Sequence, residues 1–115
     1  VVTGDARLLG KAAGNLLSNA ALYSPNGAEI RVWCGTKQGV PCFSIENTGV
    51  HIRSEAHEHL FEPFYREEFS RSRKTGGSGL GLYLVQMILE RHGAFCTIEN
   101  TADGVQAAVR FPNQT

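Results

Sequence analysis

The stretch "DARLLGKAAGNLLSNAAL", residues 5–22, organises the predicted fold. Its apolar side chains recur every three or four residues, which is the spacing of one helix face, so we expect a helix over these residues. The apolar positions are Leu8, Leu9, Ala12, Ala13, Leu16, Leu17 and Ala20. Asp5 is a suitable N-cap, and the segment "SPNG" at 24–27 ends the helix with proline and glycine.

Four stretches with the composition of strands follow, in two pairs. Residues 28–34 ("AEIRVWC") and 40–47 ("VPCFSIEN") are joined by "GTKQG", which predicts a hairpin. Residues 95–100 ("FCTIEN") and 105–112 ("VQAAVRFP") are joined by "TADG" and form the second predicted pair.

Helical and polar segments lie between the two strand pairs. We expect a short helix over 54–61, a long polar loop over 65–78 and a second long helix over 80–92, which Gly93 ends. This order predicts an α+β fold, a two-layer α/β sandwich in which about three helices cover one face of a mixed, mostly antiparallel sheet. The other face of the sheet should be more solvated.

Length and charge limit the classes of function. The 115 residues fit one domain, and 11 basic residues balance 11 acidic ones, so neither nucleic acid nor a membrane surface is an expected partner. No apolar run approaches the roughly 20 residues that span a bilayer. The chain opens on "VVTGDARLL", without a methionine or a signal peptide. We therefore expect residues 1–115 to be one domain of a longer protein.

Three cysteines, Cys34, Cys42 and Cys96, each fall in a predicted strand. The chain has no C-x-x-C pair, so neither a zinc site nor a dithiol redox site is expected. We expect three reduced, half-buried thiols of a cytosolic protein.

The stretch "TGGSGLGL" at 75–82 is rich in glycine at the start of the second long helix; the glycines are Gly76, Gly77, Gly79 and Gly81. Free N–H groups and a partial positive charge at a helix start attract anions, and glycine lets the backbone approach phosphate oxygens closely. The pattern fits neither a P-loop nor a dinucleotide-binding turn. A flexible hinge without a ligand is the alternative reading.

Asn15 and Asn19 stand one turn apart on the first helix, so their amides lie on the same face. Two amide oxygens at this spacing can ligate a hard cation such as Mg²⁺, whose other ligands would be water and phosphate oxygens. Two solvent-facing amides are the alternative.

A series of motifs resembles the ATP-binding catalytic domain of sensor histidine kinases. In order, they are "NLLSNAALYSP" at 15–25, similar to the N box, "NTG" at 47–49, "LFEPFYR" at 60–66, similar to the F box, and "GGSGLGL" at 76–82. The resemblance covers nearly the whole chain, and its overall pattern is similar to vancomycin-resistance sensor kinases. It implies the Bergerat-type ATP-binding fold shared with gyrase, the ninety-kilodalton heat-shock chaperone and mismatch-repair ATPases.

The resemblance also implies a set of site residues. Those implied to bind ATP are Asn15, Asn19, Tyr23, Asn47, Gly49, Ile52, Phe64, Gly77, Gly79, Leu80 and Gly81. Asn15 and Asn19 are the implied Mg²⁺ ligands, and with Arg66, which would reach the phosphates, they are the implied catalytic residues.

The roles implied by the resemblance differ along the site. Tyr23 would lie against the adenine ring, and Asn47 and Gly49 would form the adenine-recognition turn. Phe61 and Phe64 would pack at the base of a lid that the glycines bound.

Three positions depart from the family's pattern. Asn47 replaces an aspartate, and its neutral amide oxygen accepts a weaker hydrogen bond from the adenine amino group than a carboxylate would. His51 replaces a glycine, which bears on the geometry of the turn. Leu22 stands where a basic residue often faces the phosphates; Arg66, Arg71, Arg73 and Lys74 are candidate substitutes, with a solvated charge run as the alternative.

The function implied by the resemblance is transfer of the γ-phosphoryl group of Mg²⁺-bound ATP to a histidine on a separate dimerisation domain, in two-component signalling through a response regulator. The chain would be the cytoplasmic domain of a bacterial membrane sensor and a monomer in isolation. His51, His57, His59 and His92 are expected to be surface or loop residues, neither phosphoacceptors nor metal ligands. The alternatives are a nucleotide-independent interaction module and an anti-sigma-type serine kinase.

Overall fold

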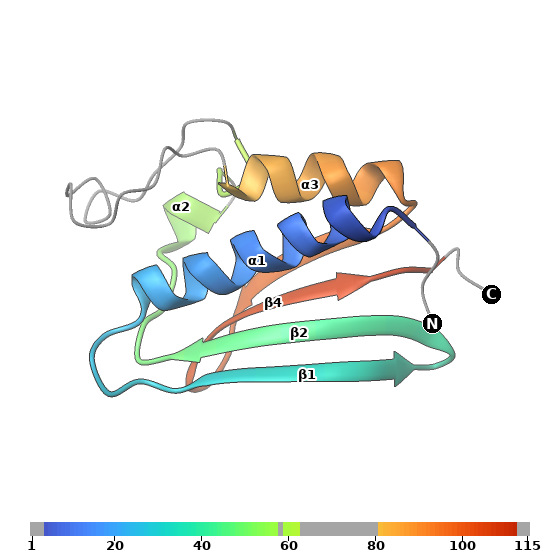
Figure 1. The fold of residues 1–115 in the computed structure, drawn as a ribbon. Helices are drawn as coiled ribbons and strands as arrows, with labels where there is room; N and C mark the ends of the chain where they lie inside the picture. Colours follow the sequence, from blue (N-terminus) through green and yellow to red (C-terminus); the bar gives the residue numbers. More distant parts are fainter. Residues whose placement is uncertain (1–3, 58, 63–80, 113–115) are drawn as a thin grey trace.

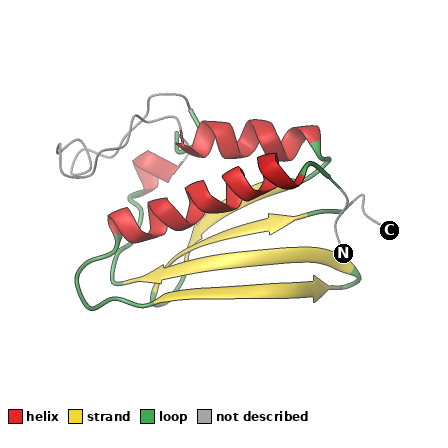
Figure 2. Cartoon of the chain, viewed as in Figure 1, coloured by secondary structure: helices red, strands yellow, loops and turns green. Residues whose placement is uncertain are grey.

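The computed structural model describes residues 4–57, 59–62 and 81–112. Its elements, in chain order, are α1 (Ala6–Tyr23), β1 (Ile30–Lys37), β2 (Val40–Thr48), α2 (Ser54–His57), α3 (Gly81–Arg91), β3 (Phe95–Asn100) and β4 (Gly104–Arg110). The helices lie together on one side of the sheet, so the predicted α+β sandwich of two layers is confirmed (Figures 1 and 2).

The four strands form one sheet in the order β1-β2-β4-β3. Each of its three pairings is antiparallel. We expected a mixed sheet, and the part of the chain that the structure describes contains no parallel pair. The two hairpins predicted from the sequence meet through β2 and β4, which therefore form the centre of the sheet.

The ends of α1 follow the predicted signals. Asp5 Oδ1 accepts hydrogen bonds from the backbone N–H groups of Arg7 at 3.0 Å and Leu8 at 3.2 Å, which is the bonding of an N-cap. The helix ends at Tyr23, and Ser24 and Pro25 follow it as expected. α3 ends at Arg91, and Gly93 has the positive φ of 66° that a helix C-terminal glycine supplies.

Two boundaries were predicted wrongly. The loop expected over 35–39 is a two-residue turn, because β1 continues to Lys37. The two turn residues, Gln38 (φ 54°) and Gly39 (φ 79°), both have the positive φ that a type I′ turn requires. The helix expected over 54–61 ends at His57. The bonds from His59 N to Ala56 O and from Glu62 N to His59 O, both 3.0 Å, span three residues, so single turns replace the expected last part of the helix.

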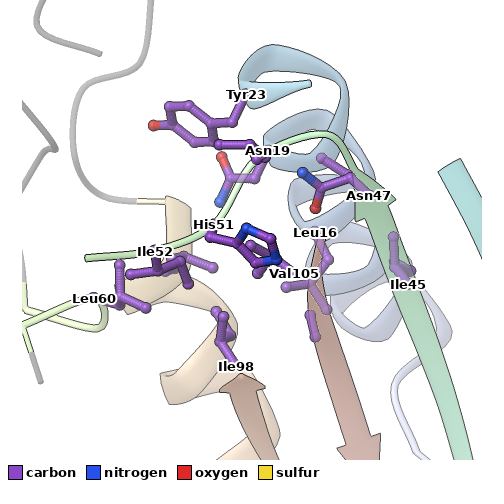
Figure 3. Close-up of a pocket in the computed structure, with 14 residues that line it drawn as sticks. Leu16, Asn19, Tyr23, Ile45, Asn47, His51, Ile52, Leu60, Ile98 and Val105 are labelled. Atoms are coloured by element: carbon purple, nitrogen blue, oxygen red, sulfur yellow. The ribbon is translucent and has the colours of Figure 1, made fainter. Parts of the chain in front are cut away.

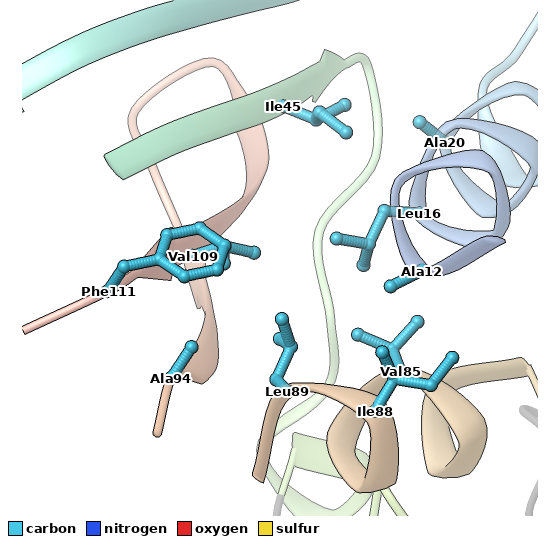
Figure 4. Close-up of a cluster of buried hydrophobic side chains, with 10 residues drawn as sticks. All are labelled: Ala12, Leu16, Ala20, Ile45, Val85, Ile88, Leu89, Ala94, Val109 and Phe111. Carbon is cyan, nitrogen blue, oxygen red and sulfur yellow. The ribbon is translucent and has the colours of Figure 1, made fainter. Parts of the chain in front are cut away.

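The core lies between α1, α3 and the inner face of the sheet (Figure 4). Its buried members are Ala12, Leu16, Ala20, Ile45, Val85, Ile88, Leu89, Ala94, Val109 and Phe111. The helical members recur at three- and four-residue spacing, so one apolar face of each helix is removed from water. Packing of these faces fixes α1 and α3 side by side above the strands.

The three cysteines are free thiols, as expected, and Cys42 and Cys96 are half-buried; the prediction that Cys34 is half-buried was wrong, because its side chain is exposed on β1. Cys34 is exposed, whereas burial raises the pKa of the Cys96 thiol to about 12. Within the described residues, no helix is both long enough and apolar enough to cross a bilayer.

Candidate functional site

A cavity of about 110 Å³ opens between the helices and one end of the sheet. α1, β2, β3, β4 and the segment from residue 50 to 52 all contribute to its wall (Figure 3). Its labelled lining residues are Leu16, Asn19, Tyr23, Ile45, Asn47, His51, Ile52, Leu60, Ile98 and Val105. Most of these side chains are apolar, and a few polar groups stand among them, which is the usual composition of a site for an organic ligand.

Asn47, near the end of β2, is a buried polar residue of the pocket. Its backbone lies in the ladder between Ile30 of β1 and Val105 of β4, and the residue is 8% exposed. Its amide points into the cavity (Figure 3) and has no hydrogen-bond partner among the residues that the structure describes. A buried amide without a partner costs about 1–3 kcal/mol. The arrangement therefore favours a ligand that forms hydrogen bonds with Asn47.

The two asparagines of α1 both lie beside Gly81, the first residue of α3. The Asn15 Nδ2 atom is 3.5 Å from the carbonyl oxygen of Gly81, at the limit of a hydrogen bond. A side chain built at Gly81 would place its Cβ 3.8 Å from both amide atoms of Asn19. Asn19 lines the pocket, whereas Asn15 does not. The Asn15 and Asn19 amides, which were predicted to lie on one face of α1, thus lie beside the start of α3.

The segment after β2 forms another wall of the pocket, and two features hold it in place. Gly49 has a φ of 86°, and a Cβ at this position would lie 2.8 Å from the Pro25 ring, so the turn requires glycine. Beyond it, the Asn100 side chain accepts from Ile52 N at 2.8 Å and donates to Ile52 O at 3.0 Å. This pairing fixes Ile52 against the end of β3.

Asn100 and Gly104 were missed in the sequence. A Cβ at Gly104 would lie 2.0 Å from the Asn47 carbonyl oxygen, so glycine is what allows β4 to pass this close to β2. Asn100 precedes the "TADG" turn and Gly104 is its last residue, where Thr101 Oγ1 accepts from Gly104 N at 3.0 Å. Their position at a turn was the available signal, but a sequence does not reveal which distant backbone a turn residue approaches.

His51 lies in a loop, as predicted, and its side chain also lines the pocket. Its Nε2 is 2.9 Å from the Thr101 carbonyl oxygen, so this nitrogen donates the hydrogen bond. Among the described residues other than glycine, only Gln38 has a positive φ, so His51 adopts ordinary backbone geometry without the freedom of glycine. The Cβ that His51 adds therefore does not strain the loop.

The other histidines are surface or turn residues, as expected, and they also make specific contacts. His92 Nδ1 donates to the Ile88 carbonyl oxygen at 2.8 Å, and its Nε2 accepts from Asp5 N at 3.0 Å, which ties the end of α3 to the start of α1. His57 Nε2 bonds to the Ile98 carbonyl oxygen. Among the described residues, no three His, Cys, Asp or Glu side chains gather as a metal site would require.

The predicted site residues fall into three groups. Asn19, Tyr23, Asn47 and Ile52 line the pocket; Asn15, Gly49 and Gly81 adjoin it through the contacts described above. Phe64, Arg66, Gly77, Gly79 and Leu80 lie outside the described residues. Leu22 is exposed and does not line the pocket. Several apolar lining residues were missed because they look like ordinary core positions in the sequence: Leu60, Leu82, Ile98 and Val105.

Comparison with known families agrees with this geometry. The family model described as "Histidine kinase-, DNA gyrase B-, and HSP90-like ATPase" matches residues 4–115. The chain belongs to this family of ATP-binding domains, and within it is a catalytic domain of the sensor histidine kinase type.

Individual relatives are sensor kinases. The chain is 43% identical, over 91% of its length, to the sensor protein VanSB of Enterococcus faecalis, and 39% identical, over 96%, to the sensor histidine kinase CusS of Escherichia coli. It superposes on the mycobacterial sensor histidine kinase MprB with a TM-score of 0.85 at 31% identity, covering 96% of this chain and 76% of that one. The chain spans about a quarter of the length of the two sensor proteins, at 24% and 23%.

Proposed function

We propose that the pocket holds Mg²⁺-bound ATP and that the domain directs its γ-phosphoryl group to a histidine nitrogen on a separate dimerisation domain. The observation that carries this proposal is the buried Asn47 amide, which has no hydrogen-bond partner among the described residues. It faces a mostly apolar cavity that Asn19, beside the start of α3, also lines. A flat, apolar base with polar edges fits the first part of the cavity, and a chain of phosphates fits the second.

The base-binding part is built from β2 and its neighbours. The Asn47 amide oxygen would accept a hydrogen bond from the adenine amino group, which satisfies a buried group that has no partner among the described residues. Tyr23 and Ile52 line the same cavity and supply apolar contact to the ring faces. Asn100 acts on this contact indirectly, because it holds Ile52 by two hydrogen bonds.

The phosphate-binding part lies where α1 meets α3. α3 has eleven residues and no acidic side chain in its first turn, so the partial positive charge of its start is not neutralised there. Asn19 and Asn15 adjoin this helix start. Their amide oxygens are ligands that suit Mg²⁺, which when bound would supply charge neutralisation at the phosphates.

The same residues favour transfer to a histidine over hydrolysis. Asn15 cannot take a proton near neutral pH, so it cannot activate water as a carboxylate would. A histidine nitrogen is itself a nucleophile, and the domain's contribution would be positioning and electrostatic stabilisation. Arg66 and the glycines Gly77 and Gly79 are proposed to act on the phosphates from outside the described residues.

We place this domain, residues 1–115, on the cytoplasmic side of a bacterial membrane sensor. Its protein partners would be the histidine-bearing dimerisation domain of the same sensor and a response regulator. The relatives are whole sensor proteins about four times the length of this chain, which supports this setting.

Two measurements test the proposal. Calorimetric titration of the 115-residue chain with Mg²⁺-ADP should give a dissociation constant of tens to hundreds of micromolar, roughly −5 to −6 kcal/mol. A nucleotide-independent interaction module would give no binding heat in this range. With a cognate dimerisation domain and labelled ATP, we expect an acid-labile phosphohistidine, whereas an acid-stable phosphoserine would support the serine kinase alternative.

A further inference from the structure

None of the residues that the structure describes forms a hydrogen bond that would hold the Asn47 amide in one orientation. Its two ends differ chemically, since Oδ1 only accepts hydrogen bonds and Nδ2 only donates them. Among the described residues neither end has a partner, and its cross-strand neighbours Ile30 and Val105 are apolar. A half-turn about the last side-chain torsion therefore exchanges acceptor and donor in the cavity without breaking a contact that the structure describes.

This freedom bears on which purine the pocket takes. Adenine presents an amino donor at C6 and an acceptor at N1, so it pairs with the amide oxygen and amide nitrogen respectively. A 6-oxopurine, such as hypoxanthine or guanine, presents an acceptor at C6 and a donor at N1, and it pairs with the same amide turned over. A carboxylate at this position could not do both, because an ionised carboxylate has no donor for the 6-oxo group.

We propose that the pocket binds 6-oxopurine nucleotides as well as adenine nucleotides, through the reversible orientation of the Asn47 amide. The proposal rests on the proposed function, since it concerns the nucleotide pocket itself. The other groups described around the base-binding part do not oppose it: Ile45 and Ile52 are apolar, and the His51 Nε2 donor is already bonded to Thr101 O.

The experiment compares ADP with inosine diphosphate, which differs from it only at C6 and N1. Each is titrated with Mg²⁺ into the 115-residue chain in a calorimeter, and circular dichroism checks the fold of every variant. For the unmodified chain we expect dissociation constants within about tenfold of each other. A site with the wrong hydrogen-bonding group rejects its ligand strongly. Asn47→Asp should therefore weaken the binding of inosine diphosphate at least tenfold more than the binding of ADP.

Asn47→Leu provides a second, nearly isosteric variant without either hydrogen-bonding group. It should reduce the affinities for ADP and for inosine diphosphate by the same factor, because it removes the hydrogen bonds to both bases. A loss confined to one nucleotide would contradict the role given to the amide.

The outcomes separate this inference from the proposed function. If ADP binds and inosine diphosphate binds more than tenfold more weakly to the unmodified chain, the inference is overturned and the proposed function stands. An equal effect of Asn47→Asp on both nucleotides overturns it as well. If neither nucleotide binds, both proposals fail together.

Discussion

The Asn100 side chain pairs with both backbone polar atoms of Ile52, as a neighbouring strand would. Its Oδ1 accepts from Ile52 N at 2.8 Å and its Nδ2 donates to Ile52 O at 3.0 Å, although the residues are 48 positions apart. Ile52 lines the pocket and Asn100 does not. A residue outside the cavity thus determines the position of one of its walls.

Replacing Asn100 should therefore reduce nucleotide affinity more than stability. Asn100→Ala removes two hydrogen bonds at an exposed position, which predicts a loss of about 1 kcal/mol in unfolding free energy. We expect Mg²⁺-ADP to bind roughly tenfold more weakly, about 1.4 kcal/mol, because Ile52 is no longer held. Calorimetry and urea unfolding measure the two effects. Asn100→Asp, which keeps the acceptor, should show a smaller loss of affinity; an unchanged affinity in both variants would contradict this role.

Gly49 and Gly27 form a matched pair for testing the turn after β2. Their φ angles are 86° and 84°, but a Cβ at Gly49 would lie 2.8 Å from Pro25, whereas a Cβ at Gly27 would meet nothing within 4 Å. Gly27→Ala should cost about 1 kcal/mol for the left-handed backbone alone. Gly49→Ala should cost about 1–3 kcal/mol more, from overpacking.

Chemical unfolding of both variants measures this difference. Adding Pro25→Ala to Gly49→Ala should recover part of the cost, since the ring is then absent. Equal destabilisation by the two single substitutions would show that the Pro25 contact has no energetic consequence.

The two asparagines of α1 should differ in their effect on Mg²⁺-dependent binding. Asn19 lines the pocket, whereas the Asn15 amide lies against the Gly81 carbonyl oxygen. We expect Asn19→Ala to weaken Mg²⁺-ADP at least about tenfold, near 1.4 kcal/mol, and Asn15→Ala to weaken it less. Titrations with and without Mg²⁺, alongside thermal melting, distinguish a lost ligand contact from a lost fold. Asn19→Asp and Gly79→Ala should abolish phosphotransfer while leaving the melting temperature nearly unchanged.

The thiols should react with iodoacetamide in an order set by exposure and pKa. Cys34 is exposed, so it should be alkylated first. Because burial raises the pKa of Cys96 to about 12, very little of its thiolate forms at pH 8, and the folded chain should protect it. Mass spectrometry of digested samples measures the order. Labelling of Cys96 as fast as Cys34 in the folded chain would contradict the structure.

The raised pKa of the Cys96 thiol also leads us to expect a loss of stability at high pH. The folded-state pKa is raised, so the unfolded chain releases this proton first as the pH rises above about 8.5, and stability falls towards pH 12. The slope from this one group is about 1.4 kcal/mol per pH unit. Cys96→Ala should remove it, as unfolding free energies at pH 8 and 10 would show.

Periodicity and turn residues predicted most of the fold. The spacing of Leu8, Ala12 and Leu16 located α1, and Asp5 and Pro25 located its ends, because these signals are local. The α2 boundary was predicted wrongly, since a single turn is stabilised by its surroundings rather than by its own sequence. The antiparallel pairing of β2 with β4 could not be derived from composition, because strand order depends on contacts between distant residues.

The site was predictable only in part. Asn19 was found because it interrupts the apolar pattern of its helix, whereas Asn47 was found because its motif "NTG" resembles the adenine-recognition turn of the family. Asn100 and Gly104 were not, since their importance lies in how close they come to the backbone of Ile52 and Asn47. Leu60 and Ile98 carry no signal that separates a cavity wall from a core, and only the three-dimensional arrangement distinguishes them.

The position of Trp33, the single tryptophan of the chain, makes it a built-in optical reporter of folding. Its neighbour Val32 pairs with Ile45 of the core, so the indole lies on the opposite face of the sheet, where its ring packs over Gly35 and lies 5.1 Å from the Lys37 ammonium group. Its emission will follow denaturation yet remain insensitive to occupancy of the cavity. Tryptophan fluorescence can therefore show that each variant is folded, while calorimetry measures its nucleotide binding.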